Sequence, residues 1–412
     1  MAAIIPTHQH RSLTQLAVRA RFHAESKLMG TPDFERFVRR FPAIDALRGG
    51  LVLLVVLHHV HLRFVLNKYA VATLLPKAGA RVIFWSGYYA VVMFFVVSGF
   101  LITHHSLRRW RSLARLPLGS FYWLRLTRIY PCLLALLAVL TTFHLLGLSG
   151  YVIDPGKSSL PRAVLAALTF HFNWLEGTRG YLPGAWDVLW SLSVEEAFYL
   201  GFPLLCVWLR SERLIACALV LLIAIGPVSR ALTTDSPWDE YAYLSCLDCI
   251  AFGCLAAWAH VRAPQQARAR WLTRSLQFIG ALLIGAVIAA RETVGSLRLP
   301  ELGLSVTLLA LGTALVLWAT AQQASAVPLR GSSWLCAIGE RSYEIYLTHM
   351  FVVLAMVSVF RSSGLSLAWA WVFYAAATLA SIALGFVVAR WVGPRLTTLL
   401  RSGALWRVRA PR

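Results

Sequence analysis

The stretch IDALRGGLVLLVVLHHV (Ile44–Val60) shows the main property of this chain. Its apolar run has the length and composition of a membrane helix, which needs about twenty mostly apolar residues. Asp45 and Arg48 stand at its beginning, however, and His58 and His59 occupy positions where a lipid-facing helix has apolar side chains. Ionisable residues inside a membrane helix are costly and indicate a function by default. The stretch therefore predicts a membrane helix that carries chemistry.

The composition extends this prediction to the whole chain. Of its 412 residues, 58% are hydrophobic and only 14% are charged, and the mean hydropathy is +0.65. A soluble domain of this length needs more charge to cover its surface. We expect an all-α polytopic bundle of about ten transmembrane helices, because apolar runs of about twenty residues recur. The predicted spans lie near 44–66, 83–104, 129–149, 186–209, 214–228, 242–260, 275–290, 302–320, 335–357 and 366–389.

The net charge of +21 has a topological explanation. Cytosolic loops of membrane proteins are rich in Lys and Arg. With the N-terminus inside, the cytosolic segments hold 28 of the 39 Lys and Arg residues. This bias places both termini in the cytosol and removes the need for a nucleic-acid partner. We expect a cytosolic leader at 1–40, partly disordered or interfacial, a membrane domain at 41–391 and a basic cytosolic tail at 392–412.

Arg48 and His59 share one face of the first helix. At about 100° per residue, eleven residues end about 20° past three full turns, and they rise about 16 Å. His58 points about 80° away from that face. His59 is then about halfway through a hydrocarbon core roughly 30 Å thick. Its alternative role is a hydrogen bond to another helix that serves packing alone.

The stretch WSLSVEEAFYL (Trp190–Leu200) places two adjacent carboxylates inside a predicted span. Glu195 and Glu196 need a polar cavity or cationic partners there. Ser191, Glu195 and Tyr199 follow each other at intervals of four and form one polar stripe along a helix. A purely structural role for both glutamates is disfavoured.

Three further stretches bring polar groups to the predicted membrane boundary or interior. Arg125 and Arg128 lie three residues apart and suit phosphate binding by forked hydrogen bonds, although topology or lipid headgroups explain them equally well. Ser98 interrupts the apolar run FFVVSGFLI, which packing also explains. In the third stretch, ERSYEIYLTHMFV (Glu340–Val352), Tyr346 and His349 share a helical face. Together these groups describe a membrane-embedded active site or a transport path.

No metal site is expected from this sequence. The seven cysteines lie mostly in apolar spans, and the CxxC formed by Cys246 and Cys249 lacks further ligands at suitable spacing. The run HHVH (His58–His61) is likewise not expected to bind a metal.

From Phe41 to Trp391 the chain resembles the acyltransferase-3 family of integral membrane acyltransferases, which are mostly bacterial. Arg48 and His59 match the family's signature of an arginine, ten residues and a histidine in the first helix. The other matching motifs occur in the family's order: FFVVSGFLI, FYWLRLTRIYP, WSLSVEEAFYL and SYEIYLTHMF. The chain departs from the family at Val188, where many members carry histidine.

The resemblance implies an enzyme of the bacterial cytoplasmic (inner) membrane, an O-acetyltransferase in contact with membrane lipid. Its donor is acyl-CoA from the cytosol, acetyl-CoA by default, and no metal is required. Its acceptor is a hydroxyl of a cell-envelope carbohydrate, such as lipopolysaccharide, exopolysaccharide or another polysaccharide.

These residue types fit such a transfer. His59 is the predicted general base, because its reference pKa lies near the working pH, and Glu195 is predicted to orient it. Arg48 is assigned to catalysis and, with Arg125 and Arg128, to binding CoA. Direct transfer and transient acylation of His59 both remain open. Four side chains are candidates for contacts with the substrate or the oxyanion: Ser98, Tyr346, His349 and Glu196.

A membrane carrier or flippase for a sugar-lipid or an anionic substrate is the alternative function. It also brings charges to the middle of the membrane, but it predicts inverted repeats and helices interrupted by Gly or Pro. Neither feature is clear in this sequence. A non-catalytic sensor explains the many helices but not the matched Arg, His and Glu residues.

Overall fold

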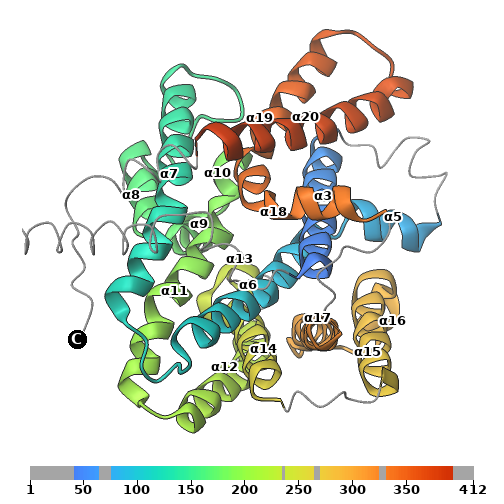
Figure 1. Ribbon diagram of the computed structural model, residues 1–412. Coiled ribbons are helices and arrows are strands. Elements are labelled where there is room, and N and C mark those ends of the chain that lie inside the picture. Colours follow the sequence, from blue (N-terminus) through green and yellow to red (C-terminus); the bar gives the residue numbers. More distant parts are fainter. Residues whose placement is uncertain (1–40, 65–75, 234–236, 264–269, 324–330, 393–412) are drawn as a thin grey trace, which may run out of the picture. The chain divides into compact units, whose positions relative to one another are not determined.

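The computed structural model describes residues 41–64, 76–233, 237–263, 270–323 and 331–392. The predicted leader at 1–40 and residues 393–412 of the predicted tail lie outside these residues. The described residues form helices and no strand, as Figure 1 shows. This arrangement confirms the predicted all-α class.

Ten helical segments in the described part of the chain are long and apolar enough to cross a membrane, as predicted. The chain is therefore a multi-pass membrane protein. Nine of the segments are single helices, and the tenth, Gly184–Leu209, joins a short helix to a long one. The long helices are α3 (Pro42–Phe64), α6 (Gly87–Trp110), α7 (Leu118–Leu145), α11 (Leu189–Leu209), α12 (Glu212–Leu232), α14 (Tyr243–Arg262), α15 (Arg270–Ala289), α17 (Leu304–Gln322), α19 (Ser342–Ser362) and α20 (Ala370–Trp391).

Short helices connect the long ones. They are α5 (Lys77–Phe84), α8 (Leu160–Leu168), α9 (Phe172–Arg179), α10 (Gly184–Asp187), α13 (Pro237–Tyr241), α16 (Arg291–Ser296), α18 (Ser333–Glu340) and the 3-10 helix η2 (Leu367–Trp369). α8 ends at Leu168 because Phe170 takes a left-handed φ of 57° and the His171 amide donates to the Ala166 carbonyl at 2.9 Å.

Two predicted boundaries are wrong. The third span begins at Leu118 rather than near residue 129, so Arg125 and Arg128 lie within α7. The predicted span 335–357 is divided into α18 and α19, which meet at Arg341. The division follows from packing, because a Cβ at Gly339 would meet the α3 backbone and a Cβ at Gly49 would meet the α18 backbone. The two glycines let these helices approach closely.

Small residues also bring α6 and α14 into close contact. A Cβ at Gly99 would meet the Ile250 carbonyl, and a Cβ at Gly253 would meet the Val96 backbone. α3, α19 and α20 enclose a separate apolar core that includes Val56, Ile345 and Tyr374. The face of α3 that carries Arg48 and His59 lies outside this core.

Candidate active site

Two histidines from different helices lie side by side in the membrane domain. The ring centroids of His59 on α3 and His349 on α19 are 5.1 Å apart, with an interplanar angle of 45°. His349 is fully buried, and its Nδ1 lies 2.6 Å from the Tyr346 carbonyl oxygen. A carbonyl oxygen only accepts, so neutral His349 carries its proton on Nδ1 and keeps a lone pair on Nε2. Within the described residues, His349 Nε2 and His59 Nδ1 have no hydrogen-bond partner.

His58 has different surroundings although it is adjacent to His59. Its Nδ1 lies 2.9 Å from the Phe84 carbonyl oxygen, and its ring occupies the space that a side chain at Gly87 would need. His58 thus packs against the start of α6. This difference agrees with the helical geometry, which turns the two rings to different directions.

Glu195 on α11 belongs to a second polar group. It interacts with the Ser98 hydroxyl of α6, which contacts the Tyr199 hydroxyl. The Arg125 guanidinium of α7 lies 4.6 Å from the centroid of the Tyr199 ring. Four of the long helices therefore bring side chains together here, once Arg48 of α3 is included.

Three guanidinium groups act on Glu195, and they come from Arg48, Arg125 and Arg128. Nη2 of Arg48 donates to the Ser342 hydroxyl at 2.9 Å, and its Nη1 lies 3.4 Å from Asp45. We call these three arginines, with Glu195 and Glu196, the arginine group.

Glu196 completes the arginine group from the next position of α11. It interacts with Arg125 and Arg128 and is buried, and its Oε1 has no hydrogen-bond partner within the described residues. The two adjacent glutamates thus share the same cations, as a pair of buried carboxylates requires.

His105 was not predicted as part of the site, although the structure places it with the arginines. It interacts electrostatically with Arg48, Arg125 and Arg128. The available signal was its spacing, because seven residues place His105 on nearly the same face of α6 as Ser98.

The predicted pairing of Glu195 with His59 is not among the contacts of the described residues. Glu195 interacts with the three arginines of the arginine group. The His59 ring lies next to the rings of His58 and His349. The two parts are connected through α11, where Ser191 hydrogen-bonds with the Tyr346 hydroxyl at 2.7 Å, one helical turn before Glu195. The site thus consists of a histidine pair and an arginine group, separated by about 16 Å along α3.

A cavity adjoins the histidine pair. Its volume is about 370 Å³, and His58, His59 and Tyr346 line one part of it. Arg63 and Asp187 line another part. Ligand pockets typically measure about 300–1,000 Å³. The cavity is therefore large enough for a small molecule to reach His59.

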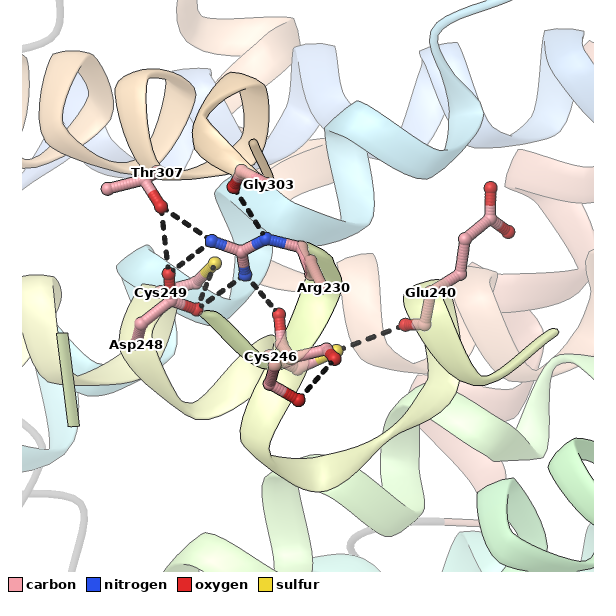
Figure 2. A network of polar contacts seen from close by, with 9 residues as sticks. Arg230, Glu240, Cys246, Asp248, Cys249, Gly303 and Thr307 are labelled. Atoms are coloured by element: carbon pink, nitrogen blue, oxygen red, sulfur yellow. Dashed lines mark hydrogen bonds and ion pairs between the residues drawn. The ribbon is translucent and has the colours of Figure 1, made fainter. Parts of the chain in front are cut away.

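Cys246 and Cys249 lie outside this site, next to a buried ion pair that Figure 2 shows. The Cys246 thiol donates to the Glu240 carbonyl oxygen at 3.1 Å, and the Cys249 thiol lies 3.3 Å from Asp248 Oδ1. No disulfide joins any of the seven cysteines, all of which lie within the described residues. The described part of the chain contains no group of three or more His, Cys, Asp or Glu side chains that could hold a metal ion.

Known proteins give an independent comparison. A family model described as an acyltransferase domain matches residues 41–390. The O-acetyltransferase OatA of Staphylococcus aureus strain NCTC 8325 / PS 47 is 24% identical to this chain over 354 residues, covering 81% of this chain and 54% of OatA. OatA of strain MRSA252 gives the same values. The chain spans about half the length of these curated relatives. No solved structure gives a significant match.

The match to the family model covers most of the chain and includes every motif on which the resemblance was based. It confirms the family predicted from the arginine–histidine signature of α3 and from the motifs of α6, α7, α11 and α19. The chain belongs to the acyltransferase-3 family of integral membrane proteins.

Proposed function

We propose that this protein is an O-acyltransferase of the bacterial inner membrane, which moves an acetyl group from cytosolic acetyl-CoA to a carbohydrate hydroxyl. The family match and the name of the OatA relatives support acyl transfer to oxygen. One observation carries the proposal. His59 lines a cavity of about 370 Å³, and the same helix carries Arg48 of the arginine group eleven residues earlier.

The arginine group is the proposed donor site. The distribution of Lys and Arg favours a cytosolic location for the Arg48 end of α3, and acyl-CoA is a cytosolic compound with several phosphates. Guanidinium groups bind phosphates through paired hydrogen bonds. Arg125 and Arg128 lie one turn apart on α7, so both can face the same ligand. The arginines would hold CoA while its thioester extends toward the histidines.

His59 is the proposed general base. It removes the proton of the acceptor hydroxyl while the oxygen attacks the thioester carbonyl, and a tetrahedral oxyanion forms. The C–S bond then breaks, and the CoA thiolate takes the proton from the His59 imidazolium. The products are an ester and CoA thiol, so protons and electrons balance. Tyr346 lines the same cavity, and its hydroxyl, which is hydrogen-bonded with Ser191, can donate a hydrogen bond to the oxyanion.

His349 takes the orienting role in this proposal. Its Nε2 lone pair can accept a hydrogen bond from the His59 imidazolium, because the rings are 5.1 Å apart and His349 holds its own proton on Nδ1. A general base is commonly oriented by a third group of this kind. Glu195 lies with the arginines, and its proposed role is to keep their guanidinium groups in position.

The test uses membranes that contain the wild-type protein, His59→Ala or no added protein. They are incubated with radiolabelled acetyl-CoA and a polysaccharide extract of the host. We expect label in the carbohydrate fraction and release of CoA thiol with the wild type alone. Movement of a sugar-lipid across the membrane without CoA-thiol release would support the carrier function and contradict this proposal.

A further inference from the structure

The part of the cavity beyond the histidines has aromatic walls. Trp190 of α11 and Tyr241 of α13 stack with their ring centroids 4.4 Å apart and an interplanar angle of 10°. The Tyr181 ring lies edge-on to Tyr241 at 5.6 Å, and the Tyr88 ring lies 6.4 Å from Trp190 at 24°. All four residues line the cavity, and they come from four separate segments of the chain.

Two charged residues face the same space. The Tyr241 hydroxyl donates to Asp187 Oδ1 at 2.8 Å, and Asp187 interacts electrostatically with Arg63. Arg63 follows His59 by four residues, so it lies about 6 Å further along α3 on a similar face. A Cβ at Gly184 would meet the Arg63 guanidinium, so the absence of a side chain there makes room for it. The cavity thus offers a carboxylate and a guanidinium one helical turn from the proposed base.

Glu176 of α9 interacts with Asp187 and helps to fix its position. Glu176 is fully buried, its Oε1 accepts from the Leu182 amide at 2.9 Å, and it interacts with Asp187. Burial, and then the nearby charge of Asp187, raise the pKa of Glu176 well above its ordinary value. The neutral form of Glu176 is thereby favoured beside Asp187.

We propose that this part of the cavity is the acceptor subsite and that it binds one uncharged sugar unit. The proposal rests on the function proposed above, in which the acceptor hydroxyl reaches His59. A sugar ring has apolar C–H faces and an edge of hydroxyl groups. Tyr181 is 48% exposed and can pack against such a face, while Asp187 accepts and Arg63 donates hydrogen bonds at the edge.

Size and charge narrow the class of acceptor. The volume of about 370 Å³ is at the low end of the range of about 300–1,000 Å³ for ligand pockets, which favours a single sugar unit. Asp187 is an acidic residue of the lining, next to the proposed edge of the sugar. An acidic sugar would meet like charge, which disfavours binding. A neutral glycan unit is therefore the expected acceptor.

The subsite is tested by binding, without any donor. The full chain is purified in lipid nanodiscs, and the probes are methyl glycosides of glucose, galactose, mannose, N-acetylglucosamine and glucuronic acid. Saturation-transfer NMR reports which glycoside contacts the protein. The variants are Asp187→Asn and Tyr181→Ala, and Tyr181 is 48% exposed, so its truncation removes little buried surface. Asp154→Asn changes an exposed carboxylate of the segment before α8 and is the matched control.

At least one neutral glycoside should bind the wild type and the Asp154→Asn control, and Asp187→Asn and Tyr181→Ala should each weaken it at least fivefold. No binding of any neutral glycoside, or tighter binding of the glucuronide, would overturn the subsite. If acetyl transfer to carbohydrate occurs and Asp187→Asn keeps the wild-type KM for the acceptor, the subsite is overturned while the proposed function stands. If a neutral glycoside binds as expected and CoA is never released, the proposed function fails and the binding site stands.

Discussion

The arginine–histidine site and the ion pair of Arg230 and Asp248 both place ionisable side chains among the long helices, but their buried polar atoms are paired to different extents. Nη1 and Nη2 of Arg230 lie 3.0 and 2.8 Å from the two Asp248 oxygens, and Nε donates to the Gly303 carbonyl at 2.9 Å (Figure 2). Arg230 Nη2 also donates to the Thr307 hydroxyl at 2.5 Å. In contrast, His59 Nδ1, His349 Nε2 and Glu196 Oε1 are buried without a partner within the described residues.

This difference indicates that buried polar groups serve two different purposes in this protein. A complete bidentate pair with extra hydrogen bonds holds α12, α14 and α17 in one arrangement and has little left to offer a ligand. Buried polar atoms without partners are costly, so they persist where a substrate or a proton completes them. We infer that the paired group serves the fold and that the unpaired group serves the reaction.

Replacing His59 tests this comparison with the largest expected effect. His59→Ala should lower the acetyl-transfer rate about 10²- to 10⁴-fold, which is the usual contribution of a general base. The melting temperature should change little, because the lost ring nitrogen has no hydrogen bond to lose. Transfer is measured as CoA-thiol release together with label in carbohydrate. His58→Ala is the matched control and should retain most of the rate; equal losses in both variants would contradict the assignment of the base.

Removing Asp248 should have its effect on stability. Asp248→Ala leaves the Arg230 guanidinium buried without its counter-ion, which costs about 3–5 kcal/mol. The melting temperature of the purified protein measures this loss. Glu301→Ala breaks the exposed pair of Arg298 and Glu301, which are 2.6 Å apart, and should cost at most about 1 kcal/mol. If both variants melt at the same temperature, the buried pair does not hold the fold.

Arg125→Ala should have a smaller effect, confined to the donor. Losing one charge-assisted contact, worth about 1.5–3 kcal/mol, should raise KM for acetyl-CoA about tenfold or more. The KM for the acceptor should rise far less. Initial rates at varied concentrations of each substrate separate the two terms. Arg162→Ala removes an exposed arginine of α8 and is the control. A rise restricted to the acceptor KM would remove Arg125 from the donor site.

Glu176 gives the smallest expected effect. It belongs neither to the Arg230–Asp248 pair nor to the arginine–histidine site. Its pKa is raised in the folded protein, so the folded state binds more protons than the unfolded state above pH 4.5, and stability falls as the pH rises from there. Glu176→Gln mimics the neutral carboxyl and should reduce this pH dependence. Melting temperatures between about pH 5 and pH 8 report the slope. Identical slopes in the variant and the wild type would show that Glu176 does not titrate with folding.

Much of the fold was predictable because each long helix has its own apolar run. The errors occurred where packing between helices decides a boundary. α7 begins at Leu118, directly after Pro117, whereas a hydropathy pattern treats Arg125 and Arg128 as the end of a span. The break between α18 and α19 depends on the contact of Gly49 with Gly339, which no local pattern contains.

The sequence motifs named most of the candidate residues but not which of them lie side by side. The motifs indicated His59, Glu195 and the arginines. The neighbour of His59 is nevertheless His349, because that depends on how α3 packs against α19. Asp187 and Arg63 resemble ordinary flanks of apolar runs in the sequence. Their proximity to each other and to the cavity exists only in the folded protein.

The most direct measurement is the acetyl-transfer rate per folded molecule, with the melting temperature of the same samples, for His59→Ala and Asp248→Ala. We expect His59→Ala to keep the wild-type melting temperature and to lose at least about 100-fold in rate, as the loss of a general base requires. We expect Asp248→Ala to melt earlier while its folded fraction transfers acetyl groups at a rate within a few-fold of the wild type. A folded His59→Ala protein that still transfers acetyl groups at the wild-type rate would contradict the division between a structural ion pair and a catalytic histidine pair.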